Sequence, residues 1–88
     1  MEFTWNPAKA VANLRKHGID FGGATKIFDD PSAIVTVDPR DYAGELRYRV
    51  IGEVEGRILC VAFTIRNERY RIISARRASR RDRTTYSV

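Results

Sequence analysis

Hydrophobic and polar residues alternate through the second half of the chain, in a pattern that predicts β-strands. Segments rich in β-branched and aromatic side chains lie at residues 47–51, 57–65 and 69–75, and such side chains favour strands. An earlier β-branched run lies at residues 33–37. Because only short turn sequences separate the last three segments, we expect an antiparallel meander with the most apolar segment at its centre.

The first part of the chain shows helical spacing after a short aromatic segment, residues 3–5, which is predicted to be an edge strand. Asn6 and Pro7 are typical of the N-cap and first position of a helix, and Gly18 is suited to end it in the left-handed conformation. A helix is therefore predicted at residues 8–17. Its buried stripe is expected to contain Ala8, Val11, Ala12 and Arg15, with Leu14 beside them.

A second helix is predicted at residues 21–28, because Asp20 can cap it and apolar residues recur three and four positions apart. Its buried stripe is expected to consist of Phe21, Ala24, Ile27 and Phe28. Gly22 and Gly23 weaken this helix by about 1 kcal/mol each relative to alanine. The sequence Asp-Asp-Pro at residues 29–31 stops it.

These elements predict one domain, residues 1–88, of the α+β class. Two N-terminal helices are expected to pack on a twisted, mainly antiparallel sheet of four or five strands, followed by a short C-terminal helix. On the most apolar strand, the side chains expected to face the helices are Leu59, Val61 and Phe63, with Phe21, Phe28 and Leu14 opposite. The longest apolar run, residues 58–63, is far shorter than the ~20 residues that span a bilayer. Residues 1–6 lack the features of a signal peptide, so we expect a cytoplasmic protein that binds no membrane.

The sequence offers no soft metal site, because it contains one cysteine and one histidine. Cys60 lies in the apolar sequence Ile-Leu-Cys-Val-Ala-Phe and is interpreted as a small core side chain. A lone cysteine forms no intrachain disulfide, which fits a reducing compartment. We therefore expect neither a metal ion nor another cofactor.

The positive charge of the chain is concentrated at its C-terminal end, although the formal net charge is only +5. Residues 1–65 contain eight Lys or Arg against nine Asp or Glu, whereas residues 66–88 contain eight arginines against Glu68 and Asp82. A surface of arginine alone is typical of phosphate recognition, because one guanidinium group can bind two phosphate oxygens. A solvated basic face is the structural alternative.

The densest part of this charge lies beside a predicted helix start. Its members are Arg76, Arg77, Arg80, Arg81 and Arg83. Ser79 and Asp82 have the spacing of a capping box, which places two of the arginines in the first turn, where cations oppose the helix dipole. We expect four guanidinium groups and the helix N-terminus to converge on one volume, an arrangement that is favourable when a phosphate or carboxylate fills it.

The chain as a whole resembles a known family. The similar segments, in order, are residues 3–10, 13–21, 28–31, 64–66 and 71–86. They look like the signatures of the BrnT family of type II toxins. The resemblance implies a RelE-like fold, ribonuclease activity that inhibits translation, and a cognate BrnA antitoxin, a small DNA-binding protein that neutralises the toxin within a hetero-oligomer.

Three positions depart from the pattern of that family. The family usually has aspartate at the position of Asn6, which changes only a helix cap. It usually has an acidic pair at the positions of Gly22 and Gly23, so the second helix is expected to be weaker here. It usually has glutamate at the position of Asp82, so the carboxylate sits on a shorter arm.

RNA cleavage without a metal ion needs a base for the 2′-OH, positive charge at the phosphorane and an acid for the leaving 5′-oxygen. Arg76, Arg80 and Arg81 suit the second role, because guanidinium stays charged and its donors have a fixed geometry. His17, the only histidine, and Asp82 are the candidates for proton transfer. A structural role at a helix end is the alternative for both.

Four further residues are candidates for binding RNA. Arg66 lies in the turn before the last strand, Arg77 and Arg83 flank the helix start, and Tyr86 lies one turn beyond it. The Tyr86 ring can stack on a base or pack in the core. RelE-like toxins often use the ribosome to position the message, so the ribosome is a candidate partner beside RNA and the antitoxin.

Two other functions fit the same arginines. A non-catalytic module would bind nucleic acid by charge alone, and a small interaction domain would use the arginines to dock an acidic protein. The resemblance favours a metal-independent endoribonuclease toxin over both.

Overall fold

The computed structural model describes residues 1–40 and 42–86 and has the predicted α+β class. Its elements, in chain order, are β1 (Phe3–Thr4), α1 (Pro7–His17), α2 (Phe21–Ala24), the 3-10 helix η1 (Thr25–Asp29), β2 (Ile34–Asp38), β3 (Arg47–Val54), β4 (Arg57–Arg66), β5 (Arg69–Arg77) and α3 (Arg80–Tyr86). Within the described residues, five strands form one sheet in the order β1-β5-β4-β3-β2. Strands β2 to β5 pair antiparallel as predicted, whereas β1 pairs parallel to β5.

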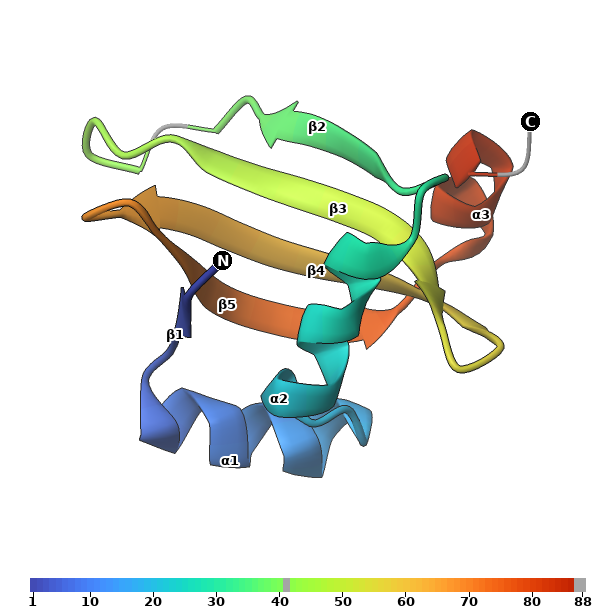
Figure 1. The fold of residues 1–88 in the computed structure, drawn as a ribbon, viewed down its shortest axis with the longest axis horizontal. Helices are drawn as coiled ribbons and strands as arrows, with labels where there is room; N and C mark the ends of the chain where they lie inside the picture. The colour runs from blue at the N-terminus through green and yellow to red at the C-terminus, as the bar shows by residue number, and fades with distance from the viewer. Residues whose placement is uncertain (41, 87–88) are drawn as a thin grey trace.

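The N-terminal helices leave one face of the sheet open. Helices α2 and η1 cross the other face, α1 lies along the β5 edge, and α3 lies at the end where β5 finishes and β2 begins (Figure 1). Among the described residues, no helix has both the length and the hydrophobicity to cross a membrane.

The hydrophobic core lies between the sheet and the α2–η1 segment. Leu59, Val61 and Phe63 of β4 face it and are at most 3% exposed, which confirms the predicted face of the central strand. Phe21 and Phe28 pack against this face from the helical side, also as predicted.

Phe63 occupies the centre of an aromatic cluster within this core. Its ring centroid lies 5.1 Å from that of Phe28, 5.1 Å from that of Tyr70 and 5.4 Å from that of Tyr48. Such contacts add to the free energy that area burial alone provides. Phe63 therefore links strands β3, β4 and β5 to the 3-10 helix.

The predicted buried stripe of α1 is wrong. Ala8, Val11, Ala12 and Leu14 are all exposed, and the exposed fractions of Val11 and Leu14 are 52% and 50%. The helix instead turns Ala10 and Asn13 inward.

Asn13 explains this rotation, because its carboxamide makes the hydrogen bonds to the edge of β5 that a neighbouring strand would otherwise make. Its Nδ2 donates to the carbonyl oxygen of Ala75 (2.8 Å), and its Oδ1 accepts from the Ala75 N–H (3.1 Å). Strand β1 ends before it reaches this part of β5, so the peptide groups of Ala75 need another partner. A buried polar side chain supplies it, which a search for an apolar stripe overlooks.

The second helix is helical where predicted, but it is not one α-helix. Helix α2 covers only Phe21–Ala24, and the chain then tightens into η1. Asp20 caps α2 as predicted, since its Oδ2 accepts from the Gly23 N–H (2.9 Å). Gly22 and Gly23 give an α-helix so little intrinsic stability that packing decides its geometry.

Truncation of Phe63 tests the assignment of the core. We expect Phe63→Ala to lower the free energy of unfolding by about 3–5 kcal/mol, because it leaves a cavity among three aromatic rings. Ile65→Ala, on the same strand at a side chain that is 48% exposed, serves as the control and should cost much less. Urea unfolding of both variants checks this, and equal losses would contradict the assigned face.

Candidate functional site

One extra residue in β5 determines which side of the sheet its last side chains face. Phe63 pairs with Ile72 and Ala62 pairs with Ser74, so Ile73 has no partner in β4. This β-bulge shifts the alternation of the strand by one residue.

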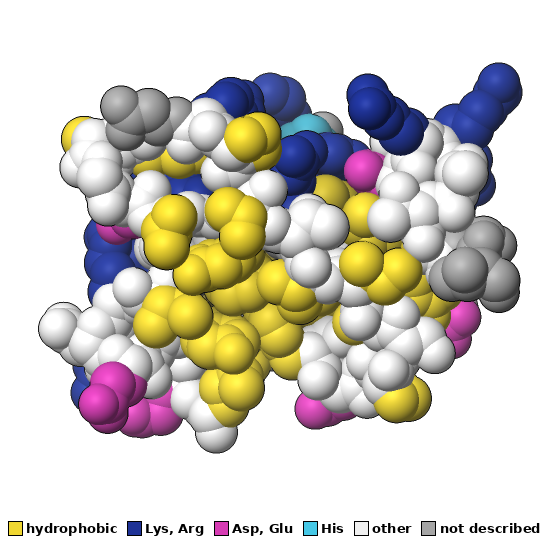
Figure 2. All heavy atoms as spheres, turned by 90° about the horizontal axis from the view of Figure 1, so that it is seen from above, with side chains coloured by type: hydrophobic (Ala, Val, Ile, Leu, Met, Phe, Trp, Pro, Cys, Tyr) yellow, Lys and Arg dark blue, Asp and Glu magenta, His cyan; other side chains and the backbone are white. Residues whose placement is uncertain are grey.

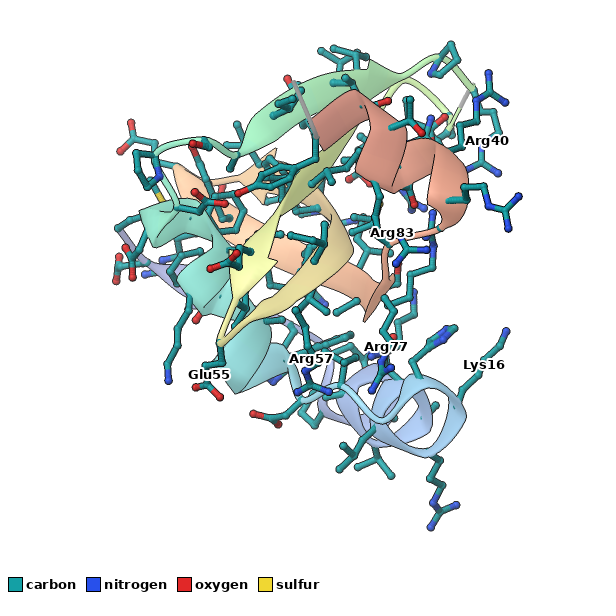
Figure 3. The ribbon with its side chains drawn as sticks, turned by 90° about the vertical axis from the view of Figure 1, so that its right-hand side faces the viewer. Lys16, Arg40, Glu55, Arg57, Arg77 and Arg83 are labelled. Carbon is teal, nitrogen blue, oxygen red and sulfur yellow. The ribbon has the colours of Figure 1, made fainter. Side chains whose placement is uncertain are left out.

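The bulge sends the last two arginines of β5 to opposite sides of the sheet. Arg76 is paired with Cys60 on the open face, whereas Arg77 is paired with the core residue Leu59, and residues directly opposite in an antiparallel pair share a face. In Figure 3, Arg77 lies beside α1, below the Arg83 side chain of α3. Arg77 therefore does not join Arg76 in the convergence predicted from the sequence.

A hollow of about 220 Å³ lies on the open face of the sheet. Ala62 and Ser74, neighbours across β4 and β5, contribute small side chains to its lining. The charged residues among its described lining are Arg40, Arg47, Arg49, Arg76 and Asp38. In Figure 2, the Lys and Arg side chains gather along the upper side of the view, which is the side away from α2 and η1. The open face is therefore rich in basic side chains.

Three of these four arginines pair with carboxylates. The pairs are Arg40 Nη2 with Asp38 Oδ2 (2.7 Å), Arg47 Nε with Glu45 Oε1 (3.2 Å) and Arg76 Nη1 with Asp82 Oδ2 (2.7 Å). Each pair fixes the direction of a guanidinium group at the rim of the hollow.

Tyr42 strengthens one side of the rim. Its hydroxyl group donates to Asp38 Oδ2 (2.8 Å), and the guanidinium carbon of Arg47 lies 4.1 Å from the centroid of its ring, a cation–π contact. The hydrogen bond to Asp38 raises the pKa of the Tyr42 phenol. The phenol therefore stays protonated at neutral pH.

Arg49 is the exception among the four arginines. Among the described residues no carboxylate pairs with it, and its Nε is buried without a hydrogen-bond partner. It lies in the middle of β3, in register between Thr36 of β2 and Ala62 of β4. It borders both this hollow and a second one of about 260 Å³ between α3 and the sheet.

The predicted capping box forms at the start of α3. The Asp82 N–H donates to Ser79 Oγ (3.1 Å), and the Ser79 N–H donates to Asp82 Oδ2 (2.9 Å). Arg76 Nη1 donates to the same oxygen (2.7 Å). Burial would raise the pKa of Asp82, but hydrogen bonds from Ser79 and Arg76 outweigh it and hold that pKa below its usual range. Asp82 is therefore ionised at neutral pH and joins α3 to the end of β5.

Tyr86 is directed away from the hollow. Its hydroxyl group donates to Asp30 Oδ2 (2.7 Å), and this hydrogen bond raises the pKa of Tyr86 to about 12. The contact fastens the end of α3 to the segment that leads into β2, so the structure places Tyr86 in packing rather than among the lining residues.

The other predicted site residues lie at different distances from the hollow. Arg81 borders the second hollow with Asp82, and Arg80 and Arg83 are exposed on α3. Arg66 lies at the β4–β5 turn, at the opposite end of the sheet from α3 (Figure 1), where its Nη2 is 2.8 Å from Glu45 Oε2. His17 ends α1 and lines neither hollow.

Sequence reasoning missed Arg40, Arg47 and Arg49 as site residues. Arg47 and Arg49 alternate with Tyr48 and Val50, and the buried Val50 shows that both arginines lie on the face away from the core. Their nearness to Arg76 depends on the order of the strands and on the bulge, and neither can be read from the alternation alone.

Cys60 is buried as predicted, at 3% exposure, beneath Arg76 on the open face. Burial raises the pKa of its thiol, so the thiol stays protonated at neutral pH. Within residues 1–40 and 42–86, no group of three His, Cys, Asp or Glu side chains is placed as in a metal site.

Comparison with protein families matches residues 5–82 to one whose description is the ribonuclease toxin, BrnT, of type II toxin–antitoxin systems. The chain belongs to the BrnT family. The match covers most of the sequence and all elements except β1 and the end of α3. Among curated proteins no relative matches the chain.

Membership of the BrnT family makes this chain a ribonuclease toxin of the type II class. Such a toxin acts on RNA and has an antitoxin protein as its partner. The resemblance found in the sequence is thereby confirmed.

The contacts of Asp82 predict a pH dependence. Because the pKa of Asp82 is lower in the folded than in the unfolded chain, its contribution to stability is present above about pH 4 and is lost as the pH falls. We expect Asp82→Asn to lower the free energy of unfolding by about 1 kcal/mol at pH 7. The gap between wild type and variant should shrink at pH 3, and urea unfolding at both pH values that gives an unchanged gap would contradict this assignment.

Proposed function

We propose that this toxin cleaves RNA in the hollow on the open face, without a metal ion, and that a BrnA-type antitoxin neutralises it by covering that surface. The observation that carries the proposal is the gathering of Arg40, Arg47, Arg49 and Arg76 around one hollow beside the start of α3. Guanidinium groups bind phosphate oxygens in a forked geometry. The reaction takes place in the cytoplasm, where messages and ribosomes are available.

The proposed reaction is a transesterification within the RNA strand. The 2′-oxygen forms a bond to phosphorus while the bond from phosphorus to the 5′-oxygen breaks. A base takes the proton from the 2′-OH, and an acid delivers a proton to the leaving 5′-oxygen. Negative charge accumulates on the non-bridging oxygens at the transition state, and fixed positive donors at that place lower the barrier.

Arg76 is the best-positioned donor among the residues proposed from the sequence. Its Nη1 donates to Asp82 Oδ2 (2.7 Å) and to the carbonyl oxygen of Arg77 (3.1 Å), so the guanidinium group is held in place before RNA binds. No described residue accepts a hydrogen bond from its Nε or Nη2. We assign Arg76 to stabilising the phosphorane, together with Arg81, which borders the second hollow.

The remaining candidates have supporting roles in this proposal. Arg80 and Arg83, exposed on α3, hold flanking phosphates. Arg77 and Arg66 contact RNA only where the strand extends beyond the open face. His17 and Asp82 are the candidates for proton transfer, and Asp82 retains Oδ1 as an acceptor because the hydrogen bonds it receives from Arg76 and the Ser79 N–H both go to Oδ2.

Arg76→Lys separates a catalyst from a binding module. The variant keeps one positive charge near Asp82 but loses the forked geometry. We expect its affinity for RNA to change little and its single-turnover cleavage rate to fall about 10²-fold. Arg57→Lys, at an exposed position on the β3–β4 hairpin, is the matched control and should keep full activity.

The same assay on His17→Ala tests whether the only histidine transfers a proton.

If wild-type protein never cuts RNA, even beside ribosomes, and the arginine variants lose affinity alone, the protein is a binding module instead.

The antitoxin is expected to contact the residues from Arg76 to Arg81, because excluding RNA phosphates from the hollow silences the toxin directly. Arg80→Glu with Arg81→Glu should weaken the antitoxin complex at least tenfold, whereas Arg57→Glu should leave it intact. Titration calorimetry measures both. A structure of the complex in which these arginines stay open to solvent would rule this mode out.

A further inference from the structure

Arg49 lies at the point where the two hollows of the open face meet. It borders the hollow that contains Arg76 and the hollow that contains Arg81. Its neighbours across the sheet are Thr36 and Ala62, and small side chains of this kind leave space above the strand.

The hydrogen bonding of Arg49 is incomplete in the protein alone. Its Nε is buried and has no partner among the described residues, whereas the other three arginines of the hollow each pair with a carboxylate. A guanidinium group cannot lose its charge to relieve this cost. A buried donor without an acceptor destabilises a fold, so its presence requires a reason.

An anion in the hollow would remove that cost. Two N–H groups of one guanidinium can donate in parallel to two oxygens of a phosphate. Arg76 lies on the same face as Arg49, in the adjacent row of the sheet that runs from Ile51 through Cys60. A phosphate above Ala62 is therefore within the space that both arginines border.

We propose that Arg49 is a catalytic residue that binds the non-bridging oxygens of the RNA phosphate undergoing cleavage. This inference rests on the proposed ribonuclease function and names the ligand of the hollow, a phosphodiester. Arg49 transfers no proton. It supplies hydrogen-bond donors that stay charged, and the free energy lost by leaving Nε unpaired in the free protein is recovered when the phosphate binds.

Arg49→Met tests this, because methionine has a similar length and neither charge nor donor. Removing an unpaired buried donor should leave the unfolding temperature unchanged or higher. Single-turnover cleavage should fall about 10²–10³-fold. Inorganic phosphate should raise the unfolding temperature of the wild type more than that of the variant. Arg57→Met is the control, which should keep both the cleavage rate and the stabilisation by phosphate.

The outcomes separate this inference from the proposed function. A wild type that cleaves no RNA contradicts the proposed function. The anion site is then supported if Arg49→Met loses the rise in unfolding temperature that phosphate causes, and it is contradicted if the variant keeps that rise. A variant that cleaves within threefold of wild type overturns the inference. So does a variant that loses activity together with a large drop in unfolding temperature, because Arg49 would then be structural.

Arg49→Lys keeps the inference testable if the methionine variant does not fold. This variant retains the charge without the fork. Retained RNA binding with cleavage lowered at least tenfold supports the assignment, and full cleavage overturns it.

Discussion

The extra residue in β5, Ile73, determines on which face of the sheet the last side chains of this strand lie. With a regular strand, the alternation that buries Ile72 would turn Arg76 toward the helices. With the bulge, Ala75 returns to the core and Arg76 reaches the open face. Asn13 fastens Ala75, two residues past the bulge, to α1 through both of its peptide groups. The end of β5 that carries Arg76 is thus fixed both by its pairing with β4 and by the hydrogen bonds from Asn13 of α1 to Ala75.

Four arginines among the described residues line the hollow on the open face, and ion pairs orient most of them. Carboxylates hold three of the four arginines that line the hollow, which orients these guanidinium groups without cancelling the excess of positive charge. Helix α3 completes the surface although none of its described residues is buried. A helix this short is not stable alone; contacts near its two ends, from Arg76 to Asp82 and from Tyr86 to Asp30, hold it. The result is a basic hollow in which three of the four arginines are ion-paired.

Much of this fold can be predicted from the sequence, because strands, caps and turns depend on local patterns. The capping box at Ser79 and the buried face around Phe63 are examples. The remaining features depend on non-local pairing. The alternation of polar and apolar residues does not reveal the one extra residue in β5. A search for apolar stripes predicts that Asn13 is exposed. Arg49 looks like an ordinary surface arginine until its neighbours across the sheet are known. The family resemblance identifies the class of activity, but it does not show which arginines face the same hollow.

The central claim is that the phosphate cleaved by this toxin binds in the hollow between Arg49 and Arg76. The most direct measurement is the NMR signal of each arginine Nε–H during titration with an RNA in which every 2′-OH is replaced by 2′-O-methyl, so that it cannot be cut. We expect the Nε–H signals of Arg49 and Arg76 to shift most and to saturate together, with smaller changes on α3. Shifts confined to the exposed arginines of α3, with the Arg49 signal unchanged at saturation, would contradict it.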